Sequence, residues 1–439
     1  MKNILTLSTP PKMPNLKGKG LEAIRLLLSQ TSKDMHAPLL PMLFPVLGSK
    51  VSGAEFQYPS GQWFELCGML ADLVADSGNN KGQLGLLVEA IKRQDRQSDE
   101  IEMKKYLDYQ QTVKKRSQNC DKPDAVFPCL RCLPSDATRP GYLKAQMAAE
   151  ENGGYTTFID LPEIEGLNGL CGGHKQVTHL LRLMFDKQIY QALRATTDGI
   201  TGSARLRTNI TMSSTPDSCR DFFKSNLFDG TLGRVVFSYK PRTDRDGKIP
   251  RIGKFSDKFY QQLDLYLDRL AMIKGRYVIS PLNKLIERLA AEQAEMADLT
   301  DNDILWDMSK RSLISGFKAG CILWALNNQT WTPSIATTIE WLVIHDTWSK
   351  YQVLGDLLVK DSDTSKNDAL KKGPANMLDS MEGNSFSELQ LEALRQSLGK
   401  PTGAETKRQL RVWYARGFIE YDEQTGLWTK TESYLKRSK

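Results

Sequence analysis

The chain has 439 residues, of which 40% are hydrophobic, 25% charged and 8% aromatic, and its seven cysteines lack the spacing of a disulfide framework. This composition excludes collagen-like, disulfide-rich and wholly disordered proteins, and the length suffices for two or three domains. The 59 Lys and Arg exceed the 52 Asp and Glu, and the resulting charge of +7 permits a polyanionic partner without requiring one. Because no apolar run reaches the roughly 18 residues of a membrane span, we expect a cytoplasmic protein without membrane association.

The first 60 residues contain Pro-Pro and Lys-Gly-Lys-Gly, a helical stretch at 21–30 and a proline-broken apolar stretch at 39–47. We interpret residues 1–60 as an N-terminal helical extension.

Residues 61–255 alternate apolar strands with amphipathic helices. Strands are predicted over Trp63–Val74, Ala125–Leu133, Tyr155–Leu161, Leu206–Met212 and Arg234–Tyr239, and helices over Gln83–Arg96 and His174–Tyr190. This alternation is typical of βαβ units, so we predict an α/β core with a mainly parallel sheet and helices on both faces.

The last part of the chain changes texture. Residues 256–358 show helical periodicity alone and predict an all-helical domain, and the polar residues 359–385 predict a flexible linker. Residues 386–439 contain the helices Glu388–Ser397 and Glu405–Arg416 and then a short hairpin, which is the order of a winged-helix-like module.

The segment Ala75-Asp-Ser-Gly-Asn-Asn-Lys81-Gly-Gln lies between a predicted strand and a predicted helix, where a phosphate-binding loop belongs. Compared with G-x-x-x-x-G-K-[ST], Ala75 and Asn80 replace the glycines and Gly82 replaces the hydroxyl residue. The candidate cofactor-binding residues are Ser77, Gly78, Asn79, Asn80, Lys81 and Gly82. The alternative is a plain polar turn.

Two carboxylates follow the strand that begins at Tyr155, namely Asp160 and Glu163. An acidic strand end near a phosphate loop holds the Mg²⁺ shell or polarises the attacking water. Since the two acids are three residues apart, we expect one of them to face the site. The alternative is that they cap the next helix.

The strand from Arg205 ends in the hydroxyls of Ser213, Ser214 and Thr215, where a polar residue would sense the γ-phosphate. Arg234 follows on a turn, in the sequence position of an arginine that reaches a neighbouring subunit's nucleotide. The alternative for Arg234 is a paired surface arginine.

In the order of these segments, the chain resembles the uncharacterised primase/helicase-type P-loop ATPase family of bacterial mobile elements and phages, over about residues 35–345. The segments that carry the resemblance are Ala75–Leu84, Leu161–Glu165, Cys171–Val177, Ala192–Gly202, Ser213–Pro216 and Asp229–Tyr239. The resemblance implies a RecA/AAA+-like core followed by a helical domain. By position it implies the phosphate-loop lysine at Lys81, the acidic residue at Glu163, the sensor at Ser214 and the arginine finger at Arg234.

We therefore expect an ATP-dependent DNA helicase or translocase, with ATP and Mg²⁺ as cofactors, acting as a homo-oligomer in replication or transfer of a mobile element. A catalytically inactive P-loop scaffold that acts as a DNA-binding or assembly factor is the alternative, which Gly82 favours by lacking a hydroxyl. A structural or defence-associated interaction module is a third possibility.

The tail carries the candidate DNA contacts. They are Lys407, Arg408, Arg411 and Lys430, and the expected ligand is single-stranded or replication-fork DNA. The predicted helix Glu405–Arg416 directs Leu410 and Trp413 to the core. The alternative role for this basic helix is packing against a neighbouring subunit. Cys120, Cys129 and Cys132 lack a fourth ligand at zinc spacing, so no metal-ligating residues are predicted.

Overall fold

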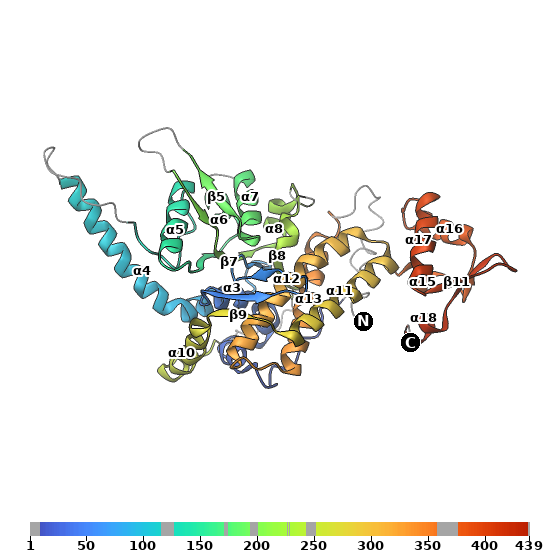
Figure 1. Ribbon diagram of the computed structural model, residues 1–439, viewed down its shortest axis with the longest axis horizontal. Coiled ribbons are helices and arrows are strands. Elements are labelled where there is room, and N and C mark those ends of the chain that lie inside the picture. The colour runs from blue at the N-terminus through green and yellow to red at the C-terminus, as the bar shows by residue number, and fades with distance from the viewer. Residues whose placement is uncertain are drawn as a thin grey trace.

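A parallel sheet of four strands lies at the centre of the fold (Figure 1), in the order β4-β7-β3-β8. The structure, a computed structural model, describes residues 9–115, 127–170, 174–193, 201–225, 227, 229–242, 252–357 and 376–437. The strands of the central sheet are β3 (Leu70–Ala75), β4 (Thr157–Leu161), β7 (Thr208–Ser214) and β8 (Val235–Lys240). The prediction of an α/β fold with a mainly parallel sheet is confirmed.

The register of the sheet aligns the carboxyl ends of its strands. Val74 of β3 lies opposite Ser214 of β7 and Tyr239 of β8, and Asp160 of β4 lies opposite Thr211 of β7. The loops that follow these parallel strands therefore leave the sheet at one common edge.

Helices cover both faces of the sheet. They are α2 (Glu22–Leu28), α3 (His36–Gly48), α4 (Gln83–Lys115), α5 (Arg139–Glu151), α6 (Gly166–Gly169), α7 (His174–Phe185), α8 (Pro216–Phe223), α9 (Thr231–Arg234), α10 (Asp257–Met272), α11 (Ser280–Thr300), α12 (Asp303–Leu326) and α13 (Pro333–Leu354), with a 3-10 turn η1 at Lys33–Met35. Small strands complete this part: β1 (Ala54–Gln57), β2 (Trp63–Phe64) and β9 (Gly275–Tyr277) form one sheet, and β5 (Ile189–Ala192) and β6 (Gly202–Arg205) form a hairpin.

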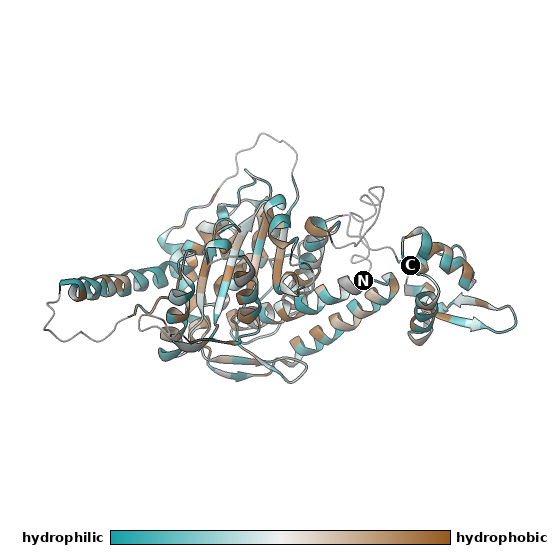
Figure 2. Ribbon diagram, turned by 90° about the horizontal axis from the view of Figure 1, so that it is seen from above, coloured by the Kyte–Doolittle hydropathy of each residue, from teal (hydrophilic) through white to brown (hydrophobic). Residues whose placement is uncertain are grey.

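Side-chain alternation along β3 assigns the two faces to separate hydrophobic clusters. Ala71 and Leu73 pack with α3 and α12, whereas Leu70 and Val74 pack with α7 and α8. The hydropathy of the ribbon agrees, because apolar residues concentrate on the strands and inner helices while the far half of α4 is mainly hydrophilic (Figure 2).

Several predicted elements differ from those observed. The expected strand over residues 63–74 is split into β2 and β3, and the expected strand over residues 125–133 is reduced, in its described part, to one bridge between Cys132 and Phe158. The proline-broken stretch is a continuous helix, α3, whose complete burial from Pro38 to Gly48 outweighs the hydrogen bonds that its prolines remove. The helix that starts at His174 ends at Phe185 rather than Tyr190.

The C-terminal residues form a separate small cluster around the end of α11 (Figure 1). Its elements are α15 (Met377–Ser380), β10 (Ser385–Phe386), α16 (Glu388–Ser397), α17 (Ala404–Ala415), β11 (Ile419–Asp422), β12 (Leu427–Lys430) and α18 (Glu432–Arg437). The prediction of a flexible linker over residues 359–385 is wrong for its last part, because Met377 and Leu378 are buried in this cluster. Residues 359–375 of the predicted linker lie outside the described part of the chain.

Candidate nucleotide-binding site

The loop between β3 and α4 has the backbone of an anion-binding turn. Gly78 and Asn80 both adopt positive φ, 80° and 62°, so the chain turns twice before α4 begins. The amides of Gln83 and Leu84 start the helical bonding at Asn80 and Lys81. No described residue accepts a hydrogen bond from the amides of Gly78, Lys81 or Gly82. Amides without acceptors at the start of a 33-residue helix favour a bound anion.

A cleft of about 500 Å³ lies beside this loop and brings together segments that are far apart in the sequence. Its lining residues are Ser77, Gly78, Asn80, Lys81, Gly82, Leu84, Gly85, Asp160, Pro162, Glu163, Ser213 and Thr215. The phosphate-loop candidates, the acidic strand end and the hydroxyl strand end thus meet in one place. Asn79 is not among the lining residues, and its carbonyl instead faces the Lys240 ammonium at 3.5 Å.

Both predicted carboxylates line the cleft, so the expectation that only one faces it is wrong. Asp160 lies within β4, where burial raises its pKa and the Thr211 hydroxyl, donating to Oδ1 at 2.8 Å, opposes the rise. Glu163 is exposed on the loop that follows β4. The site therefore offers one fixed carboxyl group and one that is free to reorient.

The sensor assignment needs correction. Ser214 turns its hydroxyl away from the cleft and donates to Oδ2 of the buried Asp72 at 2.8 Å, because consecutive strand residues face opposite sides of the sheet. Ser213 is the residue of β7 whose side chain lines the cleft. Ser214 contributes its carbonyl, which accepts a hydrogen bond from the Lys81 ammonium at 3.0 Å.

Two contacts that sequence reasoning missed support the loop from its other side. The buried Lys240, at the end of β8, pairs with Asp34 at 2.5 Å. The side-chain amide of Gln83, the first residue of α4, accepts a hydrogen bond from the backbone N–H of Ser32 and donates one to the Ser32 hydroxyl. Burial raises the pKa of Asp34, but its hydrogen bonds with Lys240 and Ser32 and the charge of Lys240 together lower this pKa below its usual value. No local pattern links residues 32–34 to the loop, because Ser32 and Gln83 are 51 residues apart in the sequence and Asp34 and Lys240 are 206 apart.

Arg234 lies at the opposite edge of the sheet, directly before β8 begins. Its guanidinium donates to the Gly230 carbonyl at 2.8 Å and pairs with Asp186 at 2.7 Å, and its side chain is only 13% exposed. An arginine finger needs a free guanidinium, so this geometry does not support the finger prediction and agrees with the alternative of a paired arginine.

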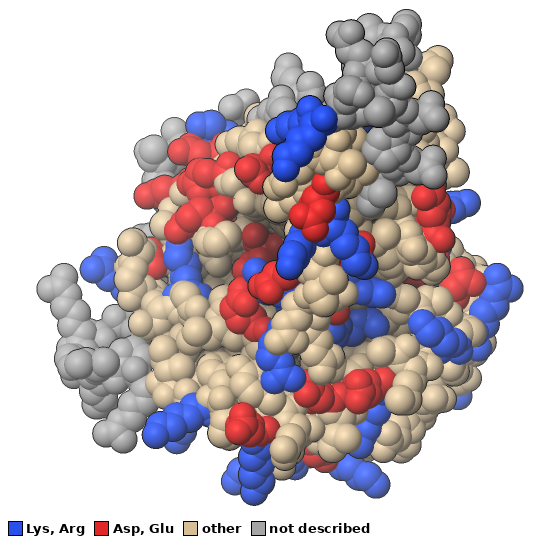
Figure 3. All heavy atoms as spheres, turned by 90° about the vertical axis from the view of Figure 1, so that its left-hand side faces the viewer, with Lys and Arg blue, Asp and Glu red and all other residues tan. Residues whose placement is uncertain are grey.

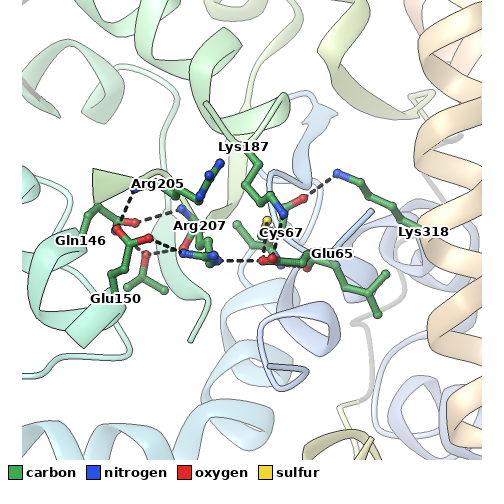
Figure 4. A network of polar contacts seen from close by, with 11 residues as sticks. Glu65, Cys67, Gln146, Glu150, Lys187, Arg205, Arg207 and Lys318 are labelled. Carbon is green, nitrogen blue, oxygen red and sulfur yellow. Dashed lines mark hydrogen bonds and ion pairs between the residues drawn. The ribbon is translucent and has the colours of Figure 1, made fainter. Parts of the chain in front are cut away.

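A polar network occupies the same amino-terminal edge of the sheet (Figure 4). Glu65 pairs with Lys187 at 2.8 Å and with Arg207 at 2.7 Å, and Arg207 also approaches Glu150 at 3.5 Å. Lys318 of α12 reaches the Cys67 carbonyl at 2.6 Å. Glu65, Glu150, Lys187 and Arg207 are thus paired with one another, and the Lys318 ammonium is held by a backbone carbonyl. The network therefore joins the strand starts to the helices rather than offering an open site.

The predicted DNA contacts of the tail fall into different environments. Lys430 is buried and donates to the Met381 carbonyl at 2.8 Å, and burial lowers its pKa, so the prediction that it contacts DNA is wrong. Arg408 pairs with Glu405 at 3.2 Å and lies 3.8 Å from Asp301. Lys407 and Arg411 are exposed.

The end of the molecule toward which α4 projects carries charges of both signs. Lys and Arg are interspersed there with Asp and Glu, without one continuous basic track (Figure 3). Lys105 of α4 is paired with Glu102 at 2.7 Å. In the basic stretch 240–254, residues 243–251 lie outside the described part of the chain.

No family model and no curated protein matches this chain. Among solved structures, the ORC2 protein of Aeropyrum pernix, in ADPNP–ADP complexes, aligns over 97% of this chain and 92% of its own, at 10% identity and a TM-score of 0.19. A TM-score of this size does not define a shared fold. We therefore infer the function of this chain from its own residues. Each helix in the described ranges is too short or too polar to cross a bilayer.

Proposed function

We propose that this chain binds ATP with Mg²⁺ in the cleft beside the 76–82 loop and acts on DNA as a helicase or translocase. The observation that carries the proposal is the meeting, in one cleft, of Lys81, the carboxyl groups of Asp160 and Glu163, and the hydroxyl of Ser213. These are the groups that phosphoryl transfer requires: a cation and amides for the phosphates, and carboxylates for a metal ion and the attacking water.

The residues present fit the two cofactors. The amides of Lys81 and Gly82, together with the Lys81 ammonium, supply donors and positive charge for a polyphosphate. Asp160 would hold Mg²⁺, because a carboxylate is the hard oxygen ligand that this ion prefers. Glu163 would orient the water that attacks the terminal phosphate.

The strand arrangement supports a RecA/AAA+-like core of the mobile-element family that the sequence resembles. β7 lies between the loop-bearing strand β3 and the acidic strand β4, so its carboxyl end contributes to the cleft between them. The same proposal includes assembly into a homo-oligomer that acts in replication or transfer of a mobile element. The paired Arg234 does not support this assembly.

The C-terminal module supports the DNA-binding part of the proposal. Its helices α15, α16 and α17 and its antiparallel sheet in the order β10-β12-β11 have the composition of a winged helix. In that fold α17 would enter a groove of DNA, and its exposed Lys407 and Arg411 would approach the phosphates.

An inactive nucleotide-binding scaffold is the second candidate, favoured by Gly82. A Cβ built at this glycine meets no atom within 4 Å, so the place where a hydroxyl would meet Mg²⁺ is open. Such a protein would bind nucleotide and DNA without turnover.

Calorimetric ATP binding and ATP turnover, each measured with and without single-stranded DNA, test both candidates. Lys81→Ala should weaken ATP binding at least tenfold, about 1.4 kcal/mol, because it removes the one cation among the described residues that line the cleft. Lys224→Ala, an exposed lysine that pairs with Asp221, is the matched control. Equal affinities of the wild type and Lys81→Ala would contradict nucleotide binding in this cleft, and binding without turnover would select the scaffold.

A further inference from the structure

A fully buried carboxyl group, that of Asp72, lies inside the sheet beneath the candidate loop. Asp72 is fully buried in the middle of β3, and its strand neighbours in register are Met212 and Phe237, which are apolar. A buried carboxylate without a direct cationic partner is costly, so its place in this strand calls for an explanation.

Asp72 is connected to the loop lysine through one residue. The Ser214 hydroxyl donates to Asp72 Oδ2 at 2.8 Å, while the carbonyl of the same Ser214 accepts from Lys81 at 3.0 Å. The other titratable groups that face Asp72 are the buried thiol of Cys219 on α8 and the carboxylate of Glu165 after β4. Lys81 is therefore the cation that responds to the charge of Asp72.

We propose that Asp72 is a positioning residue that acts through Ser214 and Lys81, and that it takes up a proton when nucleotide enters the cleft. This inference rests on the proposed nucleotide binding and adds a regulation by pH to it. A bound polyphosphate places negative charge near Asp72 and draws Lys81 from the Ser214 carbonyl toward the phosphates, and both changes favour the neutral acid.

The direction of the pH dependence follows from linkage. Burial raises the pKa of Asp72 to about 7, although hydrogen bonds from Ser214 and Cys219 and the charge of Lys81 oppose the rise. A bound nucleotide raises this pKa further, so the affinity is highest below pH 7 and falls as the pH rises through the free and bound pKa values. A further rise of about half to one unit corresponds to a loss of about three- to tenfold in affinity.

The test is calorimetric titration of the full chain with ADP from pH 6 to 8.5, in two buffers of different ionisation enthalpy. The wild type should take up protons near pH 7.5 and lose about three- to tenfold in affinity across the range. Asp72→Asn keeps the size of the side chain but cannot ionise, so it should lose this component and bind ADP more tightly than the wild type at pH 8. The titration of ADP itself is common to both proteins.

Ser214→Ala is the second variant, and it also answers the case in which Asp72→Asn does not fold. Loss of the Ser214 hydroxyl removes a hydrogen bond that lowers the pKa of Asp72. The fall in ADP affinity of Ser214→Ala should therefore occur at higher pH than that of the wild type. A purely structural Asp72 predicts weaker ADP binding by Asp72→Asn at every pH, and that result would overturn the inference. Identical pH profiles and proton uptake in the wild type and a folded variant would also overturn it while leaving nucleotide binding intact, whereas no ADP binding by any of the proteins would contradict the proposed function as well.

Discussion

Asp160 and Glu163 line the same cleft but are held to different extents. Asp160 is fixed by the Thr211 hydroxyl, whereas Glu163 is exposed on a loop. We predict that Glu163→Gln retains ATP binding but abolishes turnover, because the amide cannot accept a proton from the attacking water. Asp160→Asn should instead weaken Mg²⁺-dependent ATP binding. Steady-state turnover and binding with and without Mg²⁺ measure both effects, and loss of turnover in Asp160→Asn alone would reverse the two roles.

His345 gives the fold an acid sensitivity of its own. It is buried between the rings of Trp341 and Trp348, at centroid distances of 4.4 and 5.6 Å, and burial lowers its pKa to about 3. The unfolded chain binds a proton near pH 6.5 and the folded chain does not, so this contribution to stability is lost as the pH falls from about 6.5 toward 3.

We predict that His345→Gln loses less stability than the wild type on acidification, by up to about 1.4 kcal/mol per pH unit below 6.5. Urea unfolding at pH 7, 5.5 and 4.5 measures the difference. His179→Gln, at an exposed position, is the control and should follow the wild type. Parallel pH dependence of the wild type and His345→Gln would contradict the prediction.

At the scale of elements, local pattern located the central strands to within a few residues but not their interruptions. The break before β3 occurs at Gly68, which has a φ of 68° and lies against the end of α7. A Cβ there would lie 2.3 Å from the Met184 carbonyl oxygen, a contact between residues more than a hundred positions apart in the sequence. α3 is a similar case, because its prolines indicate a break and its burial between the sheet and α12 overrides them.

Gly68→Ala should therefore destabilise the protein by more than about 2 kcal/mol, since it combines positive φ with a backbone clash. Gly82→Ala is the matched control, because a Cβ there meets nothing within 4 Å and should change stability by less than about 0.5 kcal/mol. Chemical unfolding of both variants measures the contrast. Equal stabilities would mean that the Gly68 turn relaxes at little cost.

For the whole molecule, the chain order of the motifs predicted which segments meet at the cleft, since parallel strands end at one edge. It did not predict which side chain of a pair faces the cleft, as Ser213 and Ser214 show. It also missed partners supplied by distant segments, which bury Lys430 and pair Arg234. Charge in a sequence is therefore a poor guide to free charge in a fold.

The C-terminal module also has some charged side chains that are paired and others that are exposed. Its basic and amide side chains bind the last turn of α11, where unpaired carbonyls and the helix dipole favour cations. The contacts are Arg395 to Asp301 at 2.9 Å, Lys400 to the carbonyls of Thr300 and Asp301 at 3.0 and 2.6 Å, Gln409 and Trp413 to the Asp298 carbonyl at 2.6 and 3.1 Å, and Arg416 to the Asp298 carboxylate at 2.7 Å. One side of α17 is thus used for docking, while Lys407 and Arg411 remain on its exposed side.

This division predicts different results for two pairs of substitutions in the full chain. Phosphate contacts release counterions, so Lys407→Ala with Arg411→Ala should reduce the slope of log K for DNA against log salt by about one to two. Arg408→Ala with Arg416→Ala removes as much charge but only from residues already paired with acids, so the slope should stay within about half a unit of the wild type. Fluorescence anisotropy from 50 to 300 mM salt, with single-stranded and forked DNA, measures both slopes. A reduction in the second pair but not the first would show that DNA displaces the module from α11 and uses its docking face instead.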